Sequence, residues 1–348
     1  MQRYKSAALM VAVGLLVAAC GTSNQAANGP KAVTVGFVTH VIGDTFVQSI
    51  ARAAKDAGTD LGATVKVTGP AGFDPVAQLK MVQDIVASGA DGVSTSIPGD
   101  SMANGLNEIV ANGKPVVQFN LMSKLVKGPY VGERSTASGR LLASKIVDKL
   151  GGSSATGTVI IGICAPGLGV LENRARGVKQ GLSVASGLTV IGPLNVGVDP
   201  AGNFNAWEQA RAAHPDVKAM IGLCAPDVAN LGKLNADHGD KIIAGGYDET
   251  PQNLAAIKQG HALVTLGQSP YIQGYLPIKM IVDAIRNGTK VPQGFIDSGE
   301  EVVTADNVDA ITAREGDPAK VRAYYKHLLD THFKDPSVII EPIENEGL

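Results

Sequence analysis

The sequence has few charged residues, few aromatic residues and no surplus of either charge. Only 18% of its 348 residues are Asp, Glu, Lys or Arg, aromatic side chains make up 4%, and the formal net charge is −2. The absence of a basic stripe argues against a nucleic-acid partner. Glycine is abundant instead, with 42 residues, and the length allows one large or two medium domains. This profile is typical of a tightly turned α/β protein.

Sequence motifs of the common enzyme classes are also missing. The chain has no Walker A motif and no Gly-x-Ser-x-Gly elbow, and Glu172 replaces the third glycine of the dinucleotide fingerprint that Gly167-Leu168-Gly169 would begin. The six histidines and three cysteines show no metal-ligand spacing, so we expect no metal and no cofactor. Gly99-Asp100-Ser101-Met102 resembles the start of a GDSL-type hydrolase motif, but only Asp330-Thr331-His332 could supply its histidine. We therefore expect a protein that is not an enzyme, with hydrolysis through Ser101 as the alternative.

One apolar stretch, residues 7–19, follows two basic residues at the N-terminus and is too short to span a bilayer comfortably, and the chain has no run of 18 apolar residues. The stretch ends in Leu16-Val17-Ala18-Ala19-Cys20, which resembles a bacterial lipobox. We predict a lipoprotein signal peptide over 1–19, lipidation of Cys20 and a flexible tether over 20–31. A plain secretory signal is the alternative. The remainder would be a body that a lipid holds on the extracytoplasmic face of the cell membrane.

Apolar runs of strand length alternate with amphipathic segments of helix length, which predicts parallel sheets with crossover helices. The first series has strands near 33–38, 64–69, 92–97, 115–120 and 130–134 and helices near 45–59, 74–88 and 100–112. After a Gly-Ser loop, the second series has strands near 157–163, 188–194, 218–224, 241–247 and 261–267 and helices near 170–184, 203–213, 227–237, 250–259 and 270–286. We also expect one amphipathic helix near 317–331, in an extra C-terminal segment that is packed but peripheral.

Ligands of open α/β sheets bind where the strands end, so the polar turn 40–44 after the first strand is a candidate binding element. This strand–turn–helix resembles that of the ribose-type periplasmic binding proteins, the sugar-capturing subunits of ABC importers, which share their fold with the effector domains of LacI-type repressors. The resemblance covers about residues 31–305 and also rests on four further segments: 214–217, 245–251, 267–270 and 302–304. Within this family the chain is similar to actinobacterial lipoproteins that bind small polyols such as xylitol or threitol.

The resemblance implies a fold of two Rossmann-like lobes with parallel sheets, joined by a three-segment hinge (periplasmic binding protein type I). The crossovers would fall at about 133–136, 267–269 and 296–299. The N-terminal lobe would comprise 31–133 plus 269–297. The C-terminal lobe would comprise 134–268 plus 298–348 and would include the extra C-terminal helix.

The resemblance also implies a ligand in the cleft between the lobes, bound by carboxylates, amides and a guanidinium because buried polar groups need partners. Three residues match family positions: Asp248, Gln268 and Arg174. Their alternative roles are a helix N-cap for Asp248, a structural hinge amide for Gln268 and a surface arginine for Arg174.

In the first lobe the family carries Asp followed by Arg where this chain has Asn120-Leu121. The change removes one charge of each sign and suits a smaller or acyclic neutral ligand. Further candidates for ligand contact are Asp44, Phe46, His40 and Ser96. Asp44 could instead cap the following helix, Phe46 could belong to the core, and His40 could be a satisfied turn histidine.

Two cysteines remain when Cys20 carries lipid. Cys164 and Cys224 would lie on neighbouring strands in the family's strand order, which allows a disulfide, with two free buried thiols as the alternative. Together with the lipobox, the resemblance implies a monomeric substrate-binding lipoprotein that works with an ABC permease and ATPase. It would capture a small neutral sugar or sugar alcohol, a pentitol or tetritol being favoured, by hinge closure. A receptor subunit for signalling or chemotaxis is the alternative.

Overall fold

The structure is a computed structural model that describes residues 31–239 and 241–348. The predicted signal peptide, Cys20 and all but the last residue of the predicted tether lie outside the described residues. None of the helices in these two ranges combines the length and the apolar character that a membrane span requires.

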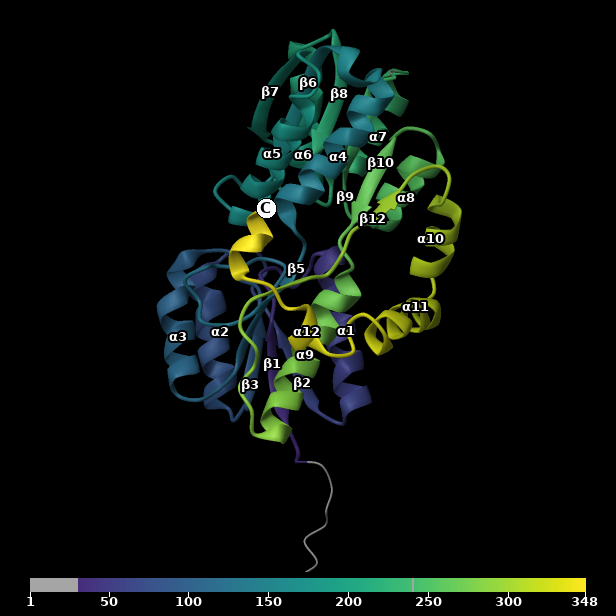
Figure 1. The fold of residues 1–348 in the computed structure, drawn as a ribbon. Helices are drawn as coiled ribbons and strands as arrows, with labels where there is room; N and C mark the ends of the chain where they lie inside the picture. Colours follow the sequence, from purple (N-terminus) through teal and green to yellow (C-terminus); the bar gives the residue numbers. More distant parts are fainter. Residues whose placement is uncertain (1–30, 240) are drawn as a thin grey trace, which may run out of the picture. The chain divides into compact units, whose positions relative to one another are not determined.

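Two six-stranded sheets form the framework, one in each lobe (Figure 1). All strand pairs of the first sheet are parallel. Its strands, in spatial order, are β11 (Phe295–Asp297), β5 (Tyr130–Gly132), β4 (Val116–Phe119), β3 (Gly92–Thr95), β1 (Thr34–Val38) and β2 (Thr64–Thr68). The central strands are buried along their length, as expected for a sheet covered on both faces.

The second sheet repeats this order with one antiparallel edge strand, β12, which pairs with β10. Its strands are β12 (Glu301–Val303), β10 (Val264–Gly267), β9 (Ile243–Tyr247), β8 (Val217–Gly222), β6 (Thr156–Ile163) and β7 (Gly187–Asn195). The two lobes of mostly parallel sheet confirm the α/β architecture that the resemblance implies.

Helices cover both faces of each sheet. In the first lobe, one face packs on α1 (Thr45–Leu61) and α9 (Pro270–Asn287), and the other on α2 (Pro75–Ala87) and α3 (Ala103–Ala111). In the second lobe, one face packs on α4 (Ser135–Leu150) and α5 (Gly169–Leu182). The other face packs on α6 (Pro200–Ala213), α7 (Asp227–His238) and α8 (Pro251–Lys258).

Helix α4 is absent from the sequence-based prediction, although it makes a close helix pair with α5. The pair is close because glycines stand at the contact: a Cβ on Gly177 would lie 2.1 Å from the Thr136 carbonyl oxygen, and one on Gly139 would lie 2.3 Å from that of Arg174. The segment carries several Ser and Thr residues besides Gly139, all of low helix propensity, so local pattern alone did not predict a helix there.

The C-terminal segment differs from the expectation. The resemblance implies a place in the C-terminal lobe, but the main helix of the segment, α11 (Pro318–Asp330), buries Val321, Tyr325 and Leu329 in the core of the first lobe. The preceding helix, α10 (Val308–Glu315), packs on the second lobe, and two short elements follow, α12 (Pro336–Ile339) and η3 (Ile343–Gly347). The segment therefore contacts both lobes. The helical pattern of α11 predicted that the helix has an apolar face. It did not predict which lobe that face packs against.

The chain passes between the sheets three times, after β5, after β10 and after β11. Hydrogen bonds join these crossovers to one another. The Ser298 amide donates to the Gly132 carbonyl (2.7 Å), and the Ser298 hydroxyl donates to the Gln268 carbonyl (3.1 Å). The Gln268 carbonyl also accepts from Gln273 Nε2 (2.7 Å), so one carbonyl oxygen connects the second crossover with the third and with α9.

Candidate functional site

A cavity of about 610 Å³ is lined by residues of both lobes. First-lobe residues at its wall follow the carboxyl ends of β1, β2 and β4, and second-lobe residues follow those of β6, β7, β8, β9 and β10. This is the edge at which ligands of parallel sheets bind. Seven of the eight residues predicted to contact ligand line the cavity: Asp248, Gln268, Arg174, Asn120, Asp44, Phe46 and His40.

Asp248 follows β9 in a left-handed backbone conformation with a φ of 78°. Such a conformation is unfavourable for a residue with a side chain, and here several hydrogen bonds hold it. The Asp248 amide donates to the Leu266 carbonyl (2.8 Å), and the Asp248 carbonyl accepts from Thr265 Oγ1 (2.9 Å) and Asn253 Nδ2 (3.0 Å). Asp248 is not the helix N-cap, because Thr250 caps α8.

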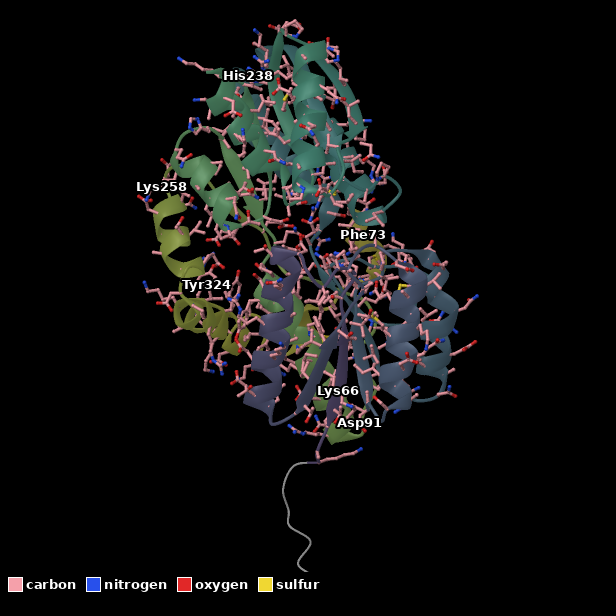
Figure 2. All side chains as sticks on the ribbon, turned by 180° about the vertical axis from the view of Figure 1, so that it is seen from behind. Lys66, Phe73, Asp91, His238, Lys258 and Tyr324 are labelled. Carbon is pink, nitrogen blue, oxygen red and sulfur yellow. A yellow bond between two sulfur atoms is a disulfide. The ribbon has the colours of Figure 1, made fainter. Side chains whose placement is uncertain are left out.

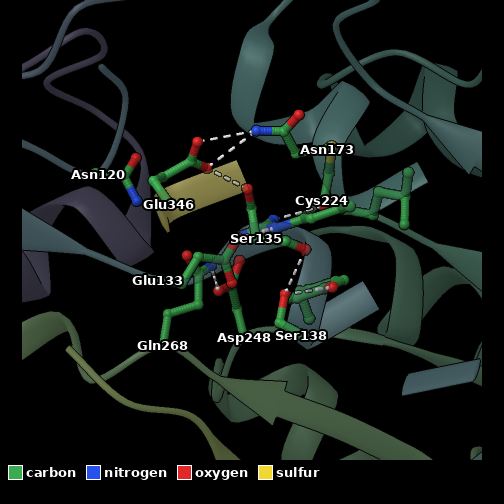
Figure 3. Close-up of polar contacts among 12 residues, drawn as sticks. Asn120, Glu133, Ser135, Ser138, Asn173, Cys224, Asp248, Gln268 and Glu346 are labelled. Carbon is green, nitrogen blue, oxygen red and sulfur yellow. Dashed lines mark hydrogen bonds and ion pairs between the residues drawn. The ribbon is translucent and has the colours of Figure 1, made fainter. Parts of the chain in front are cut away.

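Burial raises the pKa of the Asp248 carboxyl to about 7, although the neighbouring Arg174 and the Gln268 hydrogen bond act in the opposite direction. Gln268 donates from Nε2 to Asp248 Oδ1, as the dashed line in Figure 3 shows. The negative charge of Asp44, across the cavity on the first lobe, contributes to the rise in pKa. The site therefore holds a buried carboxyl whose protonation changes near neutral pH.

Arg174, on α5, is buried rather than exposed, so the surface-arginine alternative does not apply. Its Nε donates to the buried Glu133 carboxylate, and its Nη1 donates to the Leu223 carbonyl (2.7 Å). The guanidinium carbon lies 3.9 Å from the centre of the Tyr247 ring. The Glu133 charge raises the pKa of Arg174 against the effect of burial, so the side chain remains a fixed cation beside the cavity.

Asn120 follows β4 with a φ of 57°. Its backbone carbonyl accepts from the Tyr130 hydroxyl (2.7 Å), and its Nδ2 donates to Gln273 Oε1 (3.1 Å). Because Gln273 also donates to the Gln268 carbonyl, a continuous hydrogen-bonded path joins Asn120 in the first lobe to Gln268 at the second crossover.

The first turn contributes residues with mixed roles. Asp44 caps α1, since its Oδ1 accepts from the Val47 amide (3.0 Å), and it also lines the cavity. Phe46 lines the cavity and packs against the first-lobe core. His40 lines the cavity and its Nδ1 lies 3.0 Å from Ser96 Oγ, while burial lowers its pKa to about 4 and keeps the ring neutral. Ser96 is buried behind His40 and is not among the lining residues.

Cys164 and Cys224 form a disulfide at the cavity wall, with their Cα atoms 6.1 Å apart. It joins the turns that follow the adjacent strands β6 and β8. The turn at Cys224 is also held by Asp227, whose Oδ2 accepts from the Cys224 amide (2.8 Å). Asp227 Oδ1 accepts from Trp207 Nε1 (2.8 Å), so this buried aspartate positions the wall and does not reach for ligand.

Several polar atoms at the cavity have no hydrogen-bond partner among the described residues. The acceptors are Asp248 Oδ2, Gln268 Oε1 and Asn120 Oδ1, and the cationic donor is Arg174 Nη2. None of these four atoms is a fully buried polar atom without a partner, and all four residues line the cavity. Apolar side chains such as Leu121, Leu168 and Phe73 line much of the remainder. In Figure 2, Phe73 lies at the end of the first lobe that faces the second lobe, whereas Lys66 and Asp91 lie at the opposite end.

Sequence reasoning missed several residues that build this site. Glu133 accepts a hydrogen bond from Arg174, and Gln273 accepts one from Asn120. Asn253 donates to the Asp248 carbonyl and so holds the turn at Asp248. Glu133 could have been found, because a carboxylate that directly follows a buried strand at a crossover needs a cationic partner. Phe73 comes from a loop whose course no local pattern predicts.

The hydrolase alternative has no support in the geometry. Ser101 is exposed, lies in a short 3-10 turn and is not among the residues that line the cavity. Its neighbour Asp100 accepts from the Ser123 hydroxyl (2.6 Å). Within the described ranges, the histidine that forms a hydrogen bond with a serine is His40, and its partner is Ser96 rather than Ser101.

Comparisons with known proteins agree with this arrangement. Residues 35–290 match the family described as periplasmic binding protein domain. The xylose/arabinose-binding protein XylF of Sulfolobus acidocaldarius is 27% identical over 291 residues, which cover 78% of this chain and 71% of that protein. The ribose import binding protein RbsB of Salmonella typhimurium is 26% identical over 299 residues, which cover 84% of this chain and 95% of that protein.

The solved structures that are similar share the fold. An ABC transporter solute-binding protein of Burkholderia graminis in complex with D-arabinose superposes with a TM-score of 0.74 at 24% identity, covering 79% of this chain and 96% of that chain. A periplasmic solute-binding protein of Actinobacillus succinogenes with bound D-allose has a TM-score of 0.74 at 17% identity, covering 80% of this chain and 99% of that chain.

Proposed function

Because the chain belongs to the periplasmic binding protein family, we propose that it is the substrate-binding component of a carbohydrate ABC importer. The names of the relatives support this proposal, since they refer to binding of xylose and arabinose and to import of ribose. So does the D-arabinose complex of the Burkholderia graminis protein.

The observation that carries the proposal is the set of polar atoms left at the cavity. Three acceptors, Asp248 Oδ2, Gln268 Oε1 and Asn120 Oδ1, belong to residues that line the same cavity as one cationic donor, Arg174. A ligand that pairs with them donates several hydrogen bonds and accepts at least one, which is what neighbouring hydroxyl groups do. An ionised Asp248 strengthens a bond from a hydroxyl. A ligand that lacks one hydroxyl leaves a buried acceptor unpaired and binds less tightly.

Within this class we propose a pentitol or tetritol, such as xylitol or threitol. Leu121 gives the first-lobe wall an apolar side chain directly after Asn120, and it is buried against the cavity. The first lobe therefore offers few charged partners to a ligand. A small, neutral and acyclic polyol matches these partners with few hydroxyls and places its C–H groups against Leu121 and Phe73.

The ligand would act by hinge closure. It contacts Asn120 in one lobe and Asp248 and Arg174 in the other, so it favours the arrangement in which both lobes reach it. In this proposal the protein is a monomer, lipidated at Cys20 on the outer face of the membrane, and delivers its ligand to a permease and its ATPase.

A thermal-shift screen tests the proposal with D-ribose, D-xylose, D-arabinose, xylitol and threitol, and with amino acids as the contrasting class. A ligand present at about 100 times its dissociation constant adds roughly 2.7 kcal/mol to the free energy of unfolding, which raises the melting temperature by several degrees. Stabilisation by xylitol or threitol alone supports the polyol assignment. Stabilisation by pentoses alone supports the sugar importer but contradicts that assignment. Stabilisation by amino acids alone contradicts both.

A further inference from the structure

Residues 341–345 are fixed to the edge of the first sheet and to Arg134, whose Nη1 donates to the Asn345 carbonyl (2.9 Å). Glu341 exchanges two backbone hydrogen bonds with Phe295 of β11, of 2.7 and 2.8 Å. Its carboxylate accepts two hydrogen bonds from Arg134 Nη2, of 2.8 and 2.9 Å. Arg134 lies in the first crossover and also pairs with Asp297 at the end of β11 (3.4 Å). This anchor therefore joins the tail to the edge of the first sheet.

The same tail reaches the second lobe a few residues later. Arg140 on α4 donates to the Leu348 carbonyl (2.6 Å), and Arg176 on α5 donates to the Gly347 carbonyl (3.0 Å). Residues 341–348 thus run from the first sheet to the helix pair of the second lobe, beside the first crossover. They lie outside residues 35–290, the range that matches the family.

Between the two anchors, Glu346 is 1% exposed, which is unusual for a glutamate. Its carboxylate accepts from Ser135 Oγ and from Asn173 Nδ2, the latter with distances of 2.9 and 3.2 Å to its two oxygens (Figure 3). Both donors belong to the second lobe. Ser135 is the first residue of α4, directly after the crossover, and Asn173 precedes Arg174 at the cavity.

These contacts make the position of Glu346 sensitive to the angle between the lobes. Its three hydrogen bonds come from a hydroxyl and an amide rather than from a cation, so a buried carboxylate depends entirely on their geometry. The tail is held to β11, whereas the donors move with α4 and α5. A rotation of one lobe against the other would stretch these bonds or pull the tail away from β11.

We propose that residues 341–348 form a brace across the hinge, in which Glu346 is a positioning residue that holds the start of α4 and of α5. The brace restrains the two lobes in the arrangement in which Asn120 and Arg174 face one cavity. A wider distribution of lobe angles would leave a smaller fraction of molecules able to bind, and the apparent affinity falls by that fraction. The effect on affinity rests on the proposed function, whereas the restraint of the lobes does not.

Hydrogen–deuterium exchange on the ligand-free chain tests the brace with Glu346→Gln. Glutamine has one acceptor oxygen where the carboxylate has two, so it cannot accept from Ser135 Oγ and from Asn173 Nδ2 with both of the oxygens used here, and it also loses the charge. Glu344→Gln is the matched control, because Glu344 is exposed in the same tail and loses the same charge. We expect amide exchange in residues 132–136 and 170–176 to be about tenfold faster in Glu346→Gln and unchanged in Glu344→Gln. Exchange in α2 should be equal in all three proteins.

Ser135→Ala removes a donor from the other side and should accelerate exchange in the same segments, which keeps the test valid if Glu346→Gln folds poorly. Unchanged exchange in residues 132–136 and 170–176 in both variants would overturn the brace. Calorimetry with xylitol and D-arabinose then measures its effect on binding, with about tenfold weaker affinity expected for Glu346→Gln than for Glu344→Gln. Equal affinities would overturn the link to binding. If neither compound binds the wild type, the proposed ligands are wrong, and the exchange result still decides the brace.

Discussion

Replacement of Asp248 by asparagine should raise the free energy of unfolding of the ligand-free protein. It should also lower the affinity of the protein for its ligand. The asparagine keeps the Oδ1 acceptor for Gln268 and directs its new amide towards the cavity, where water can accept from it. What the substitution removes is a buried negative charge. Burial raises the pKa of this carboxyl from its ordinary value of 3.8 to about 7, so the ionised form destabilises the folded state.

The size of the effect follows from this difference in pKa. Stability contributed by a group with a raised folded pKa is present below the unfolded pKa and is lost as the pH rises through the folded pKa. The cost of ionising Asp248 is therefore absent near pH 4, grows towards pH 7 and is constant above it. About three pKa units correspond to roughly 4 kcal/mol. Local relaxation reduces this value, and we expect a gain of about 1–3 kcal/mol for Asp248→Asn at pH 8.

Melting curves between pH 4 and pH 8 measure the gain, with Asp84→Asn as the control, since Asp84 carries the same carboxyl on an exposed part of α2. Asp248→Asn should match the wild type near pH 4 and exceed it by several degrees at pH 8. Calorimetry at pH 8 should show about 5- to 30-fold weaker polyol binding, because a neutral acceptor replaces a charged one. A difference in melting temperature that is the same at both pH values, or a less stable variant at pH 8, would refute the reasoning.

Two further predictions concern the second-lobe wall. In Arg174→Lys, the lysine cannot keep the Glu133 hydrogen bond, the Leu223 hydrogen bond and the contact with the Tyr247 ring together. We therefore expect calorimetry to show an affinity for the ligand that is weaker by about tenfold or more. An unchanged affinity in a folded variant would place the ligand elsewhere. Reduction of the Cys164–Cys224 disulfide, which links residues 60 positions apart, should lower the free energy of unfolding by about 2–4 kcal/mol. The melting temperature should fall when reductant is added to the wild type but not to a Cys164→Ser/Cys224→Ser variant, and an equal response of both proteins would contradict this assignment.

The strands could be predicted from the sequence because a parallel strand with both faces covered is a continuous apolar run. Strands such as β1, β4 and β6 begin and end within one or two residues of their predicted positions. Helix α4 could not be predicted in this way. Its Ser, Thr and Gly residues have low helix propensity, and the close contact of Gly139 and Gly177 with backbone atoms of the partner helix exists only in the folded protein.

The candidate site divides in the same manner. Residues that directly follow strands, such as Asn120 and Asp248, could be placed at the cavity because parallel strands end at one edge of the sheet. Residues that come from long loops or from the C-terminal tail could not. Phe73 and Glu346 reach their positions through tertiary contacts, and nothing in their neighbouring sequence specifies those contacts.

The hydrogen bonds among the three crossovers bear on the entropy of binding. Three separate linkers would let the lobes twist, tilt and slide independently, and a ligand that fixes the lobes would lose entropy for each of these motions. Here the Ser298 side chain and amide tie the third crossover to the carbonyls of Gln268 and Gly132. The three linkers are therefore coupled to one another rather than independent. Coupled linkers leave fewer independent motions for a ligand to arrest, so we expect more of the free energy of its hydrogen bonds to be retained as affinity.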